Sequence, residues 1–265
     1  MRARKRFGQH FLHDPAVIER IVRAVGPHPS DHLVEIGPGR GALTRALLAS
    51  DAASLDAIEI DRDLAALLAS ELAGEARFAL HAADALSFDY AGLAARHRAR
   101  LRIVGNLPYN ISTPLLFRLL ASAPAIEDMH VMLQREVVER ISAPPGGGDY
   151  GRLTVMLAPR VASQHLFDIG PGAFRPAPKV WSAVVRLTVR PVPLFTPAER
   201  FAEVVAAAFA QRRKTLRNSL KGLLSAAQIA SCGIDPGARA QVLSPEDFNR
   251  LALAAAASPR GPGIG

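Results

Sequence analysis

The first half of the chain alternates between short apolar runs and stretches whose apolar residues recur at helical spacing. The apolar runs are β-prone and bounded by turn residues, which predicts strands, and a helical pattern follows each of them. The predicted strands are 32–36, 55–60, 77–82, 101–105 and 130–133. Strands that alternate with helices predict a parallel sheet with helices on both of its faces.

The first helix has a clear start signal. Asp14 is suited to the N-cap and Pro15 to the first helical position, and apolar residues at helical spacing follow as far as Val25. Gly26 and Pro27 then predict its end.

The pattern changes after about residue 143. A proline- and glycine-rich stretch at 143–148 predicts a loop, and a second irregular stretch at 174–178 leads into a predicted strand at 181–189. Further on, 198–221 has the pattern of one long helix or two, and Ser244 and Pro245 begin a last helix.

Two prolines, Pro191 and Pro193, predict a linker between a larger and a smaller domain. We therefore predict a first domain at 1–193, a helical domain at 194–258 and a disordered tail at 259–265.

The composition narrows the class of protein. The 265 residues are 49% hydrophobic and 21% charged, which is typical of globular chains and excludes wholesale disorder. The apolar runs fall short of the roughly 18 residues of a membrane helix, so we expect no membrane partner. The single cysteine, Cys232, cannot form an internal disulfide, which favours the cytoplasm, and we expect Cys232 and Trp181 to be packing residues.

The net charge of +8 is unevenly distributed. Residues 1–13 carry +4 and residues 175–221 carry +8, so the remaining residues sum to −4. Two basic regions on an acidic body favour a polyanionic partner, nucleic acid before an anionic membrane. Compositional drift toward arginine is the alternative interpretation, although it does not explain the clustering.

A glycine turn follows the first predicted strand of the sheet. Gly37, Gly39 and Gly41 lie between a strand and a helix, where the backbone can approach a ligand closely. Glu59 ends the next strand, 20 residues after Gly39, where its carboxylate could accept hydrogen bonds from ribose hydroxyls. With Asp84, which ends the third strand, these residues favour an adenosine-containing ligand.

The sharpest feature is Asn106-Leu107-Pro108-Tyr109, at the end of the fourth strand. Carboxyl ends of parallel strands bind ligands in open α/β sheets. The Asn106 side-chain oxygen and the Leu107 carbonyl could accept both hydrogens of an exocyclic amine, which would localise its lone pair, and Tyr109 could stack on the base. A structural turn with Tyr109 in the core is the alternative.

Eight blocks of sequence, in this order along the chain, together resemble the ribosomal RNA adenine dimethyltransferase family. They are RFGQHFL (6–12), VEIGPGRGALT (34–44), EID (59–61), DAL (84–86), NLPYN (106–110), QREVVER (134–140), FRPAPKVWSAVV (174–185) and RRKTLRNSLK (212–221). The resemblance covers about residues 4–250, and the last block favours the bacterial small-subunit branch. It implies a Rossmann-like class I S-adenosylmethionine-dependent methyltransferase sheet with a small all-helical C-terminal domain.

The resemblance also implies roles for particular residues. His10, Leu12, Gly37, Gly39, Glu59, Asp84 and Asn106 would bind S-adenosylmethionine, and Asn106, Leu107, Tyr109 and Phe174 would form the catalytic pocket, with Tyr109 and Phe174 on either side of the target adenine. Many relatives have asparagine where this chain has His10. No metal is required, because the sulfonium supplies the electrophile.

The basic clusters are the predicted RNA-binding residues. They are Arg4, Lys5, Arg6, Lys179, Arg212, Arg213, Lys214, Arg217 and Lys221. We expect the last five to present several charges on one side of a helix that packs through leucines on the other. A solvated helix face is the alternative.

We therefore predict an enzyme, a monomer, that dimethylates two adjacent adenines near the 3′ end of small-subunit rRNA within an assembling small ribosomal subunit. Two alternatives remain open. One is an RNA-binding ribosome assembly factor with dispensable catalysis; the other is an adenine methyltransferase that acts on large-subunit rRNA or DNA. The intact Asn106–Tyr109 block favours activity, and the C-terminal block favours the small subunit.

Overall fold

The chain divides into two units, each with its own apolar core. The computed structural model describes residues 10–257, of which 10–138 and 163–189 form the first unit and 139–162 and 190–257 form the second. The chain passes from the first unit to the second between residues 189 and 190, close to the predicted boundary at 193. The division differs from the prediction in segment 139–162, because Tyr150 and Val155 are buried in the second unit's core. The predicted tail lies outside the described residues.

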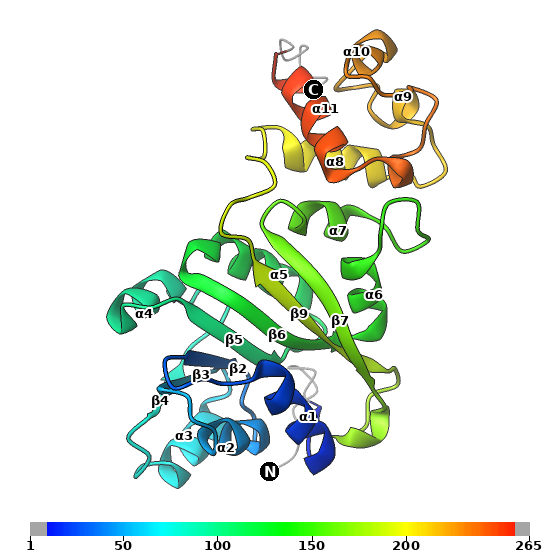
Figure 1. Ribbon diagram of the computed structural model, residues 1–265. Coiled ribbons are helices and arrows are strands. Elements are labelled where there is room, and N and C mark those ends of the chain that lie inside the picture. Colours follow the sequence, from blue (N-terminus) through cyan, green and yellow to red (C-terminus); the bar gives the residue numbers. More distant parts are fainter. Residues whose placement is uncertain (1–9, 258–265) are drawn as a thin grey trace. The chain divides into compact units, whose positions relative to one another are not determined.

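A seven-stranded sheet with the order β4-β3-β2-β5-β6-β9-β7 forms the first unit (Figure 1). Its strands are β2 (His32–Ile36), β3 (Ser54–Glu59), β4 (Phe78–Ala82), β5 (Leu101–Asn106), β6 (Ile126–Gln134), β7 (Val161–Ile169) and β9 (Ser182–Val189). Strands β4, β3, β2, β5 and β6 are parallel, and β9 pairs antiparallel with β6. The predicted parallel sheet is therefore confirmed.

Helices cover both faces of this sheet (Figure 1). One face carries α1 (Pro15–Val25), α2 (Ala42–Leu48) and α3 (Arg62–Glu71), and the other carries α4 (Tyr90–His97), α5 (Ser112–Ala121) and the short η2 (Ala123–Ala125). Helix α1 begins as predicted, because the Asp14 carboxylate accepts from the backbone N–H groups of Ala16 and Val17. It ends at Gly26, whose φ of 55° is left-handed.

Two departures from the predicted strands have physical causes. Strand β7 was not predicted, because only its end residues are fully buried and its centre is polar, as is common at a sheet edge. Strand β6 starts four residues earlier than predicted. Its polar Asp128 is buried through two hydrogen bonds from Arg102, of 2.8 and 3.0 Å, which apolar periodicity does not report.

A second, two-stranded sheet joins the start of the described chain to the irregular stretch near residue 174. Strand β1 (Phe11–Leu12) pairs antiparallel with β8 (Phe174–Arg175), which follows η3 (Pro171–Ala173). Leu12 lies opposite Phe174, and both side chains are buried in the apolar cluster of the first unit. This pairing brings residues that are more than 160 positions apart in the sequence to the same place.

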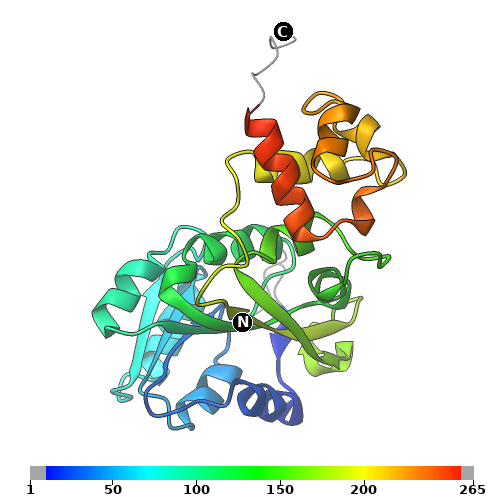
Figure 2. The ribbon, with the colours of Figure 1, turned by 45° about the horizontal axis from the view of Figure 1, so that its top comes forward.

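The second unit is helical, as predicted (Figure 2). Its elements are the end of α6 (Arg135–Ser142), α7 (Arg152–Leu157), α8 (Phe201–Phe209), α9 (Leu216–Ser219), α10 (Ala226–Ser231), η4 (Ala240–Val242) and α11 (Pro245–Ala257). Helices α8 and α11 pack on each other through a core that includes Val204, Phe248 and Leu251. Cys232 packs against this core, as predicted.

The segment 198–221, predicted as one long helix or two, contains the two helices α8 and α9, and the turn between them corrects the expectation for the basic cluster. Arg212, Arg213 and Lys214 lie in a turn between α8 and α9 rather than on one helical face. The backbone N–H groups of Leu216 and Arg217 donate to the carbonyls of Ala238 and Pro236, at 2.8 and 3.0 Å. These N–H groups therefore cannot bond four residues back, as a continuous helix requires.

No helix within residues 10–257 is long and apolar enough to cross a lipid bilayer.

Candidate active site

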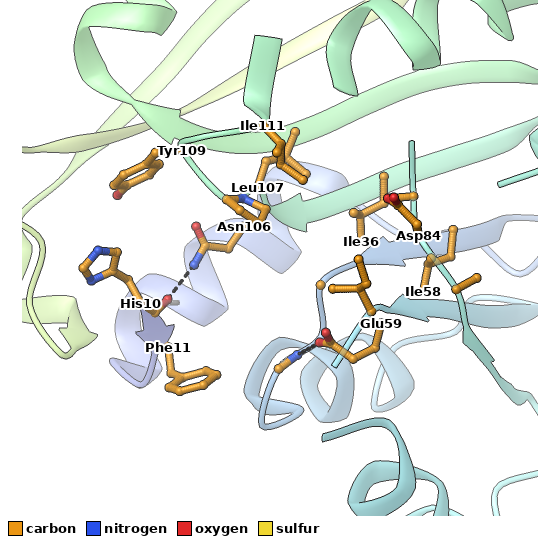
Figure 3. A pocket seen from close by; sticks show the side chains of 16 residues that line it. His10, Phe11, Ile36, Ile58, Glu59, Asp84, Asn106, Leu107, Tyr109 and Ile111 are labelled. Atoms are coloured by element: carbon orange, nitrogen blue, oxygen red, sulfur yellow. Dashed lines mark hydrogen bonds between the residues drawn. The ribbon is translucent and has the colours of Figure 1, made fainter. Parts of the chain in front are cut away.

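An open cavity lies at the carboxyl ends of β2, β3 and β5 (Figure 3). Its lining comprises His10, Phe11, Ile36, Gly37, Gly39, Ile58, Glu59, Ile60, Ala83, Asp84, Ala85, Asn106, Leu107, Pro108, Tyr109 and Ile111. Nearly all predicted pocket residues therefore meet at the edge of the sheet where the sequence placed them. A smaller adjoining hollow is lined by Leu12, Glu35 and the same glycine turn.

The glycine turn leaves the backbone open toward this cavity. Gly37, Gly39 and Gly41 have φ values of 69°, 57° and 73°, a region that favours glycine. A Cβ atom on Gly39 would lie 3.0 Å from the Phe11 ring, so the turn also packs closely against β1. The three glycines in the sequence therefore supply the left-handed backbone that this turn needs, as well as a backbone that a ligand can approach.

Glu59 ties the end of β3 to the glycine turn. Its Oε2 accepts from the N–H of Gly39 at 3.1 Å (Figure 3), and its Oε1 accepts from the N–H of Asp61 at 2.9 Å. The side chain is buried, and burial raises its pKa above the ordinary value, opposed in part by these two hydrogen bonds. Asp61 is the N-cap of α3. The carboxylate is therefore held in one orientation before any ligand binds.

Glu35 is a second buried carboxylate, which sequence reasoning missed. It lies within the otherwise buried β2 and lines the adjoining hollow beside Gly37 and Gly39. Its Oε2 has no hydrogen-bond partner among the described residues, and burial raises its pKa to about 7. The sequence did contain a signal for Glu35, because an acidic residue within an apolar strand, just before a glycine turn, is unusual.

Asn106 ends β5 with its amide fixed in one orientation. Its Nδ2 donates to the backbone carbonyl of His10 at 2.8 Å (Figure 3). The neighbouring Leu107 is fully buried, and its N–H donates to the carbonyl of Met132. Because the amide nitrogen is committed to His10, the side-chain oxygen is the group directed to a ligand.

Tyr109 lies at the other end of the cavity from Glu59 (Figure 3). Its hydroxyl shares a hydrogen bond of 2.6 Å with the hydroxyl of Ser182, and burial raises its pKa. The ring of His10 stacks on it, with centroids 5.7 Å apart and an interplanar angle of 28°. The Nδ1 atom of His10 is in turn 2.7 Å from the Pro176 carbonyl. One face of Tyr109 is therefore covered by a side chain of the protein.

Two predicted site residues do not line the main cavity. Phe174 is 2% exposed and packs in the apolar cluster with Leu12, so its ring does not face Tyr109 across the cavity. Leu12 reaches only the smaller hollow. The pairing of β1 with β8 directs both side chains inward. A role for Phe174 in stacking stays a prediction, and it requires the ring to leave this cluster.

The predicted RNA-binding residues fall in both units. Lys179 is exposed in the first unit, and Arg212, Arg213, Lys214, Arg217 and Lys221 are exposed in the second. Arg212 also donates to the carbonyl of Gly148, which anchors the turn that carries the cluster. Arg4, Lys5 and Arg6 lie outside the described residues.

Comparison with known proteins agrees with this site. The profile of the ribosomal RNA adenine dimethylase family matches residues 1–257. The chain belongs to this family. The predicted resemblance is thereby confirmed, and with it the S-adenosylmethionine-dependent methyltransferase activity.

Curated members of this family are similar over nearly their whole length. A protein of Methylococcus capsulatus named ribosomal RNA small subunit methyltransferase A is 58% identical over 92% of this chain and 95% of its own. The protein of the same name from Pseudomonas aeruginosa is 56% identical, over 95% and 94% of the two chains.

Solved structures confirm the predicted fold class. A dimethyladenosine transferase from Plasmodium falciparum superposes with a TM-score of 0.79 at 24% identity, over 92% of this chain and 96% of that one. The 23S rRNA methyltransferase ErmE superposes with a TM-score of 0.68 at 30% identity, over 93% and 99% of the two chains.

Proposed function

We propose that this member of the family dimethylates the exocyclic amines of two adjacent adenines near the 3′ end of small-subunit rRNA, with the assembling small subunit as its partner. The names of the relatives that are more than half identical to the chain support the small subunit over the large one. The observation that carries the chemistry is the fixed amide of Asn106, held by the His10 carbonyl beside Tyr109.

The residues present fit S-adenosylmethionine. The methionine part of this molecule carries an ammonium group, and the buried Oε2 atom of Glu35 lacks a partner in the hollow beside Gly37 and Gly39. Glu59 would accept from the ribose hydroxyls, and Asp84 would face the adenine edge, at the end of the cavity that they both line. Once bound, S-adenosylmethionine supplies a methyl group on a positively charged sulfur, which is the electrophile.

The chain's own residues hold and activate the acceptor. With Nδ2 committed to His10, the Asn106 Oδ1 accepts one hydrogen of the target amine, and the Leu107 carbonyl accepts the other. Both contacts turn the nitrogen lone pair out of conjugation with the ring and toward the methyl group. The nitrogen that accepts the methyl group becomes positively charged and therefore acidic, and it then loses one proton to solvent. Catalysis comes from orientation of the amine and from exclusion of water during the transfer.

The target adenine stacks on Tyr109 in this proposal. The face that His10 now covers is available to the adenine only after the His10 ring moves away. The hydrogen bond between the hydroxyls of Tyr109 and Ser182 keeps the Tyr109 ring in place when His10 moves. An adenine must also leave its own stack to enter, which costs a few kcal/mol in a duplex and less in a loop.

Phosphate contacts offset that cost. The exposed basic residues of the turn between α8 and α9 would bind the RNA backbone, and Lys179 would bind a phosphate near the target. We propose that the protein acts as a monomer in the cytoplasm, where small subunits assemble.

The test is methylation of unmethylated small subunits with labelled S-adenosylmethionine, followed by mapping of the labelled bases. We expect label on two adjacent adenines near the 3′ end, and none on subunits that already carry these methyl groups. Label on large-subunit RNA alone, or on no RNA, would contradict the proposal. The Asn106→Ala variant, assayed in parallel, shows whether the label depends on the amide.

A further inference from the structure

Trp181 is an exposed aromatic side chain that the enzyme mechanism above does not use. It is the single tryptophan of the chain, and 53% of it is accessible, although the sequence predicted a packing role. Among residues 10–257, the other large apolar side chains with high exposure are aliphatic. An indole buries more apolar surface than almost any other side chain when it finds a partner, so an exposed indole at a fixed place offers a large contact area.

The backbone and ring of Trp181 are held in position. Its carbonyl accepts from the N–H of Arg135 at 2.9 Å, and the next residue, Ser182, is fully buried at the start of β9. One edge of the indole packs toward Gly170, where an added Cβ would lie 3.8 Å from the ring. The indole is thus a supported surface and not a loose side chain.

The topology of the sheet puts Trp181 at the same edge as the cavity. Because β9 runs antiparallel to β6, the start of β9 meets the carboxyl ends of β5 and β6. Ser182 bonds the Tyr109 hydroxyl at 2.6 Å, so Trp181 is one residue away from a direct contact with the proposed base-stacking residue. In the sheet order, β6 and β9 lie on the opposite side of β5 from β3, which carries Glu59. Trp181 therefore lies beyond the end of the cavity where Tyr109 lies, which we call the acceptor end because the target base is proposed to bind there.

Basic residues accompany the indole. Arg175 and Lys179 are exposed in the segment that leads to it, and this segment contains no acid. Arg135, which bonds its carbonyl, is half exposed and lies 3.5 Å from Asp168. Of the exposed large apolar side chains among residues 10–257, Val180 is the one adjacent to Trp181 in the sequence. A protein partner would favour a wider apolar patch, whereas one aromatic ring among cations suits a base with its phosphates.

We propose that Trp181 is a stacking platform for an RNA base that flanks the target adenine in the strand. This inference rests on the proposed function for the identity of the RNA. The platform holds the strand beside the cavity while the target base enters it. Because every base has a π-face, the platform positions the strand without reading its sequence.

Intrinsic fluorescence tests the contact directly, because all tryptophan emission comes from Trp181. A single-stranded oligoadenylate of about twelve nucleotides is titrated into the full chain, with binding followed separately by anisotropy of a labelled copy. We expect quenching that saturates together with binding. A charge-matched abasic oligomer is the control and should bind without quenching. Saturated oligoadenylate binding with unchanged emission would overturn the proposal.

Kinetics on unmethylated small subunits provide the second measurement. We expect Trp181→Ala to raise KM for the subunit about tenfold with kcat and the affinity for S-adenosylhomocysteine nearly unchanged, and Trp181→Phe to restore most of the loss. Leu67→Ala removes a side chain of similar exposure on α3 and should match the wild type. A wild-type KM in Trp181→Ala would overturn the proposal.

The two proposals fail separately. Quenching by oligoadenylate without methylation of small subunits would contradict the proposed function and still support the stacking role of Trp181. Methylation of the expected adenines with an unquenched indole and a wild-type KM in Trp181→Ala would do the reverse.

Discussion

The two ends of the cavity are prepared for their ligands to different degrees. At one end, Glu59 is already bonded to the glycine turn through the N–H of Gly39, and the Glu35 Oε2 atom is buried without a partner. At the other end, one face of the Tyr109 ring is covered by His10, and Phe174 is buried in the apolar cluster.

This difference has a physical basis. The cofactor end consists of backbone and of the side chains of Glu35 on β2 and Glu59 at the end of β3, whose positions the sheet determines. The acceptor end relies on aromatic rings, and an exposed ring in a pocket gains free energy by stacking on whatever ring is near. We infer that the protein binds its cofactor in a site that is ready, and its base in a site that must open.

The largest expected effect comes from the residue between the two ends. Asn106→Ala should lower kcat by at least about a hundredfold to a thousandfold, because it removes the acceptor that orients the target amine. The affinity for S-adenosylhomocysteine, measured by calorimetry, should change by only a few fold. Retained turnover would contradict the proposed grip on the amine.

Glu35→Gln tests whether the buried carboxylate at the cofactor end lowers the stability of the folded protein. The pKa of Glu35 is raised to about 7, so the folded protein retains a proton that the unfolded chain loses near 4.5. The stability that Glu35 contributes is therefore fully present below about pH 4.5, and it is lost as the pH rises through about 7. Relative to the wild type, the variant should gain about 2–3 kcal/mol between pH 5 and pH 8 in urea unfolding.

The control for this measurement is Glu127→Gln, on an exposed position of β6. Its stability difference from the wild type should be the same at both pH values. An equally flat difference for Glu35→Gln would show that Glu35 is not buried as a charged group.

Glu59→Gln addresses the ribose contact at the same end. We expect about tenfold weaker binding of S-adenosylhomocysteine near neutral pH, because a charged acceptor is replaced by a neutral one. Burial raises the pKa of Glu59, so wild-type affinity should fall as the pH is lowered, earlier than for an exposed glutamate. Calorimetry at several pH values should show a smaller fall in Glu59→Gln than in the wild type and in the exposed control Glu19→Gln, because Glu35 still titrates in that variant.

His10→Ala should have the smallest effect and the opposite sign. Uncovering Tyr109 removes an aromatic contact of about 0.5–1.5 kcal/mol that the base would otherwise displace, so KM for the small subunit should fall a few fold. His10→Asn keeps a polar side chain and should behave similarly. A rise in KM would indicate that His10 supports the base, and a loss of cofactor affinity alone would assign its ring to the cofactor end.

The sequence was most informative where function depends on strand ends. Gly37, Glu59, Asp84 and Asn106 were placed correctly at one edge because a parallel sheet brings all its carboxyl ends together. Expectations failed for Trp181 and for the turn at Arg212–Lys214, where exposure and helix continuity depend on partners far along the chain.

Local patterns alone therefore determined the alternation of strands and helices, the glycine turn, the cap of α1 and the chemical groups of the site. These features depend on neighbours within a few residues, which the sequence displays. Only the tertiary structure decided that the Oε2 atom of Glu35 has no partner among the described residues, that His10 covers one face of Tyr109, that Phe174 is buried and that Trp181 is exposed. Each of these depends on side chains that arrive from distant segments, and burial is a property of the assembled fold rather than of the residue.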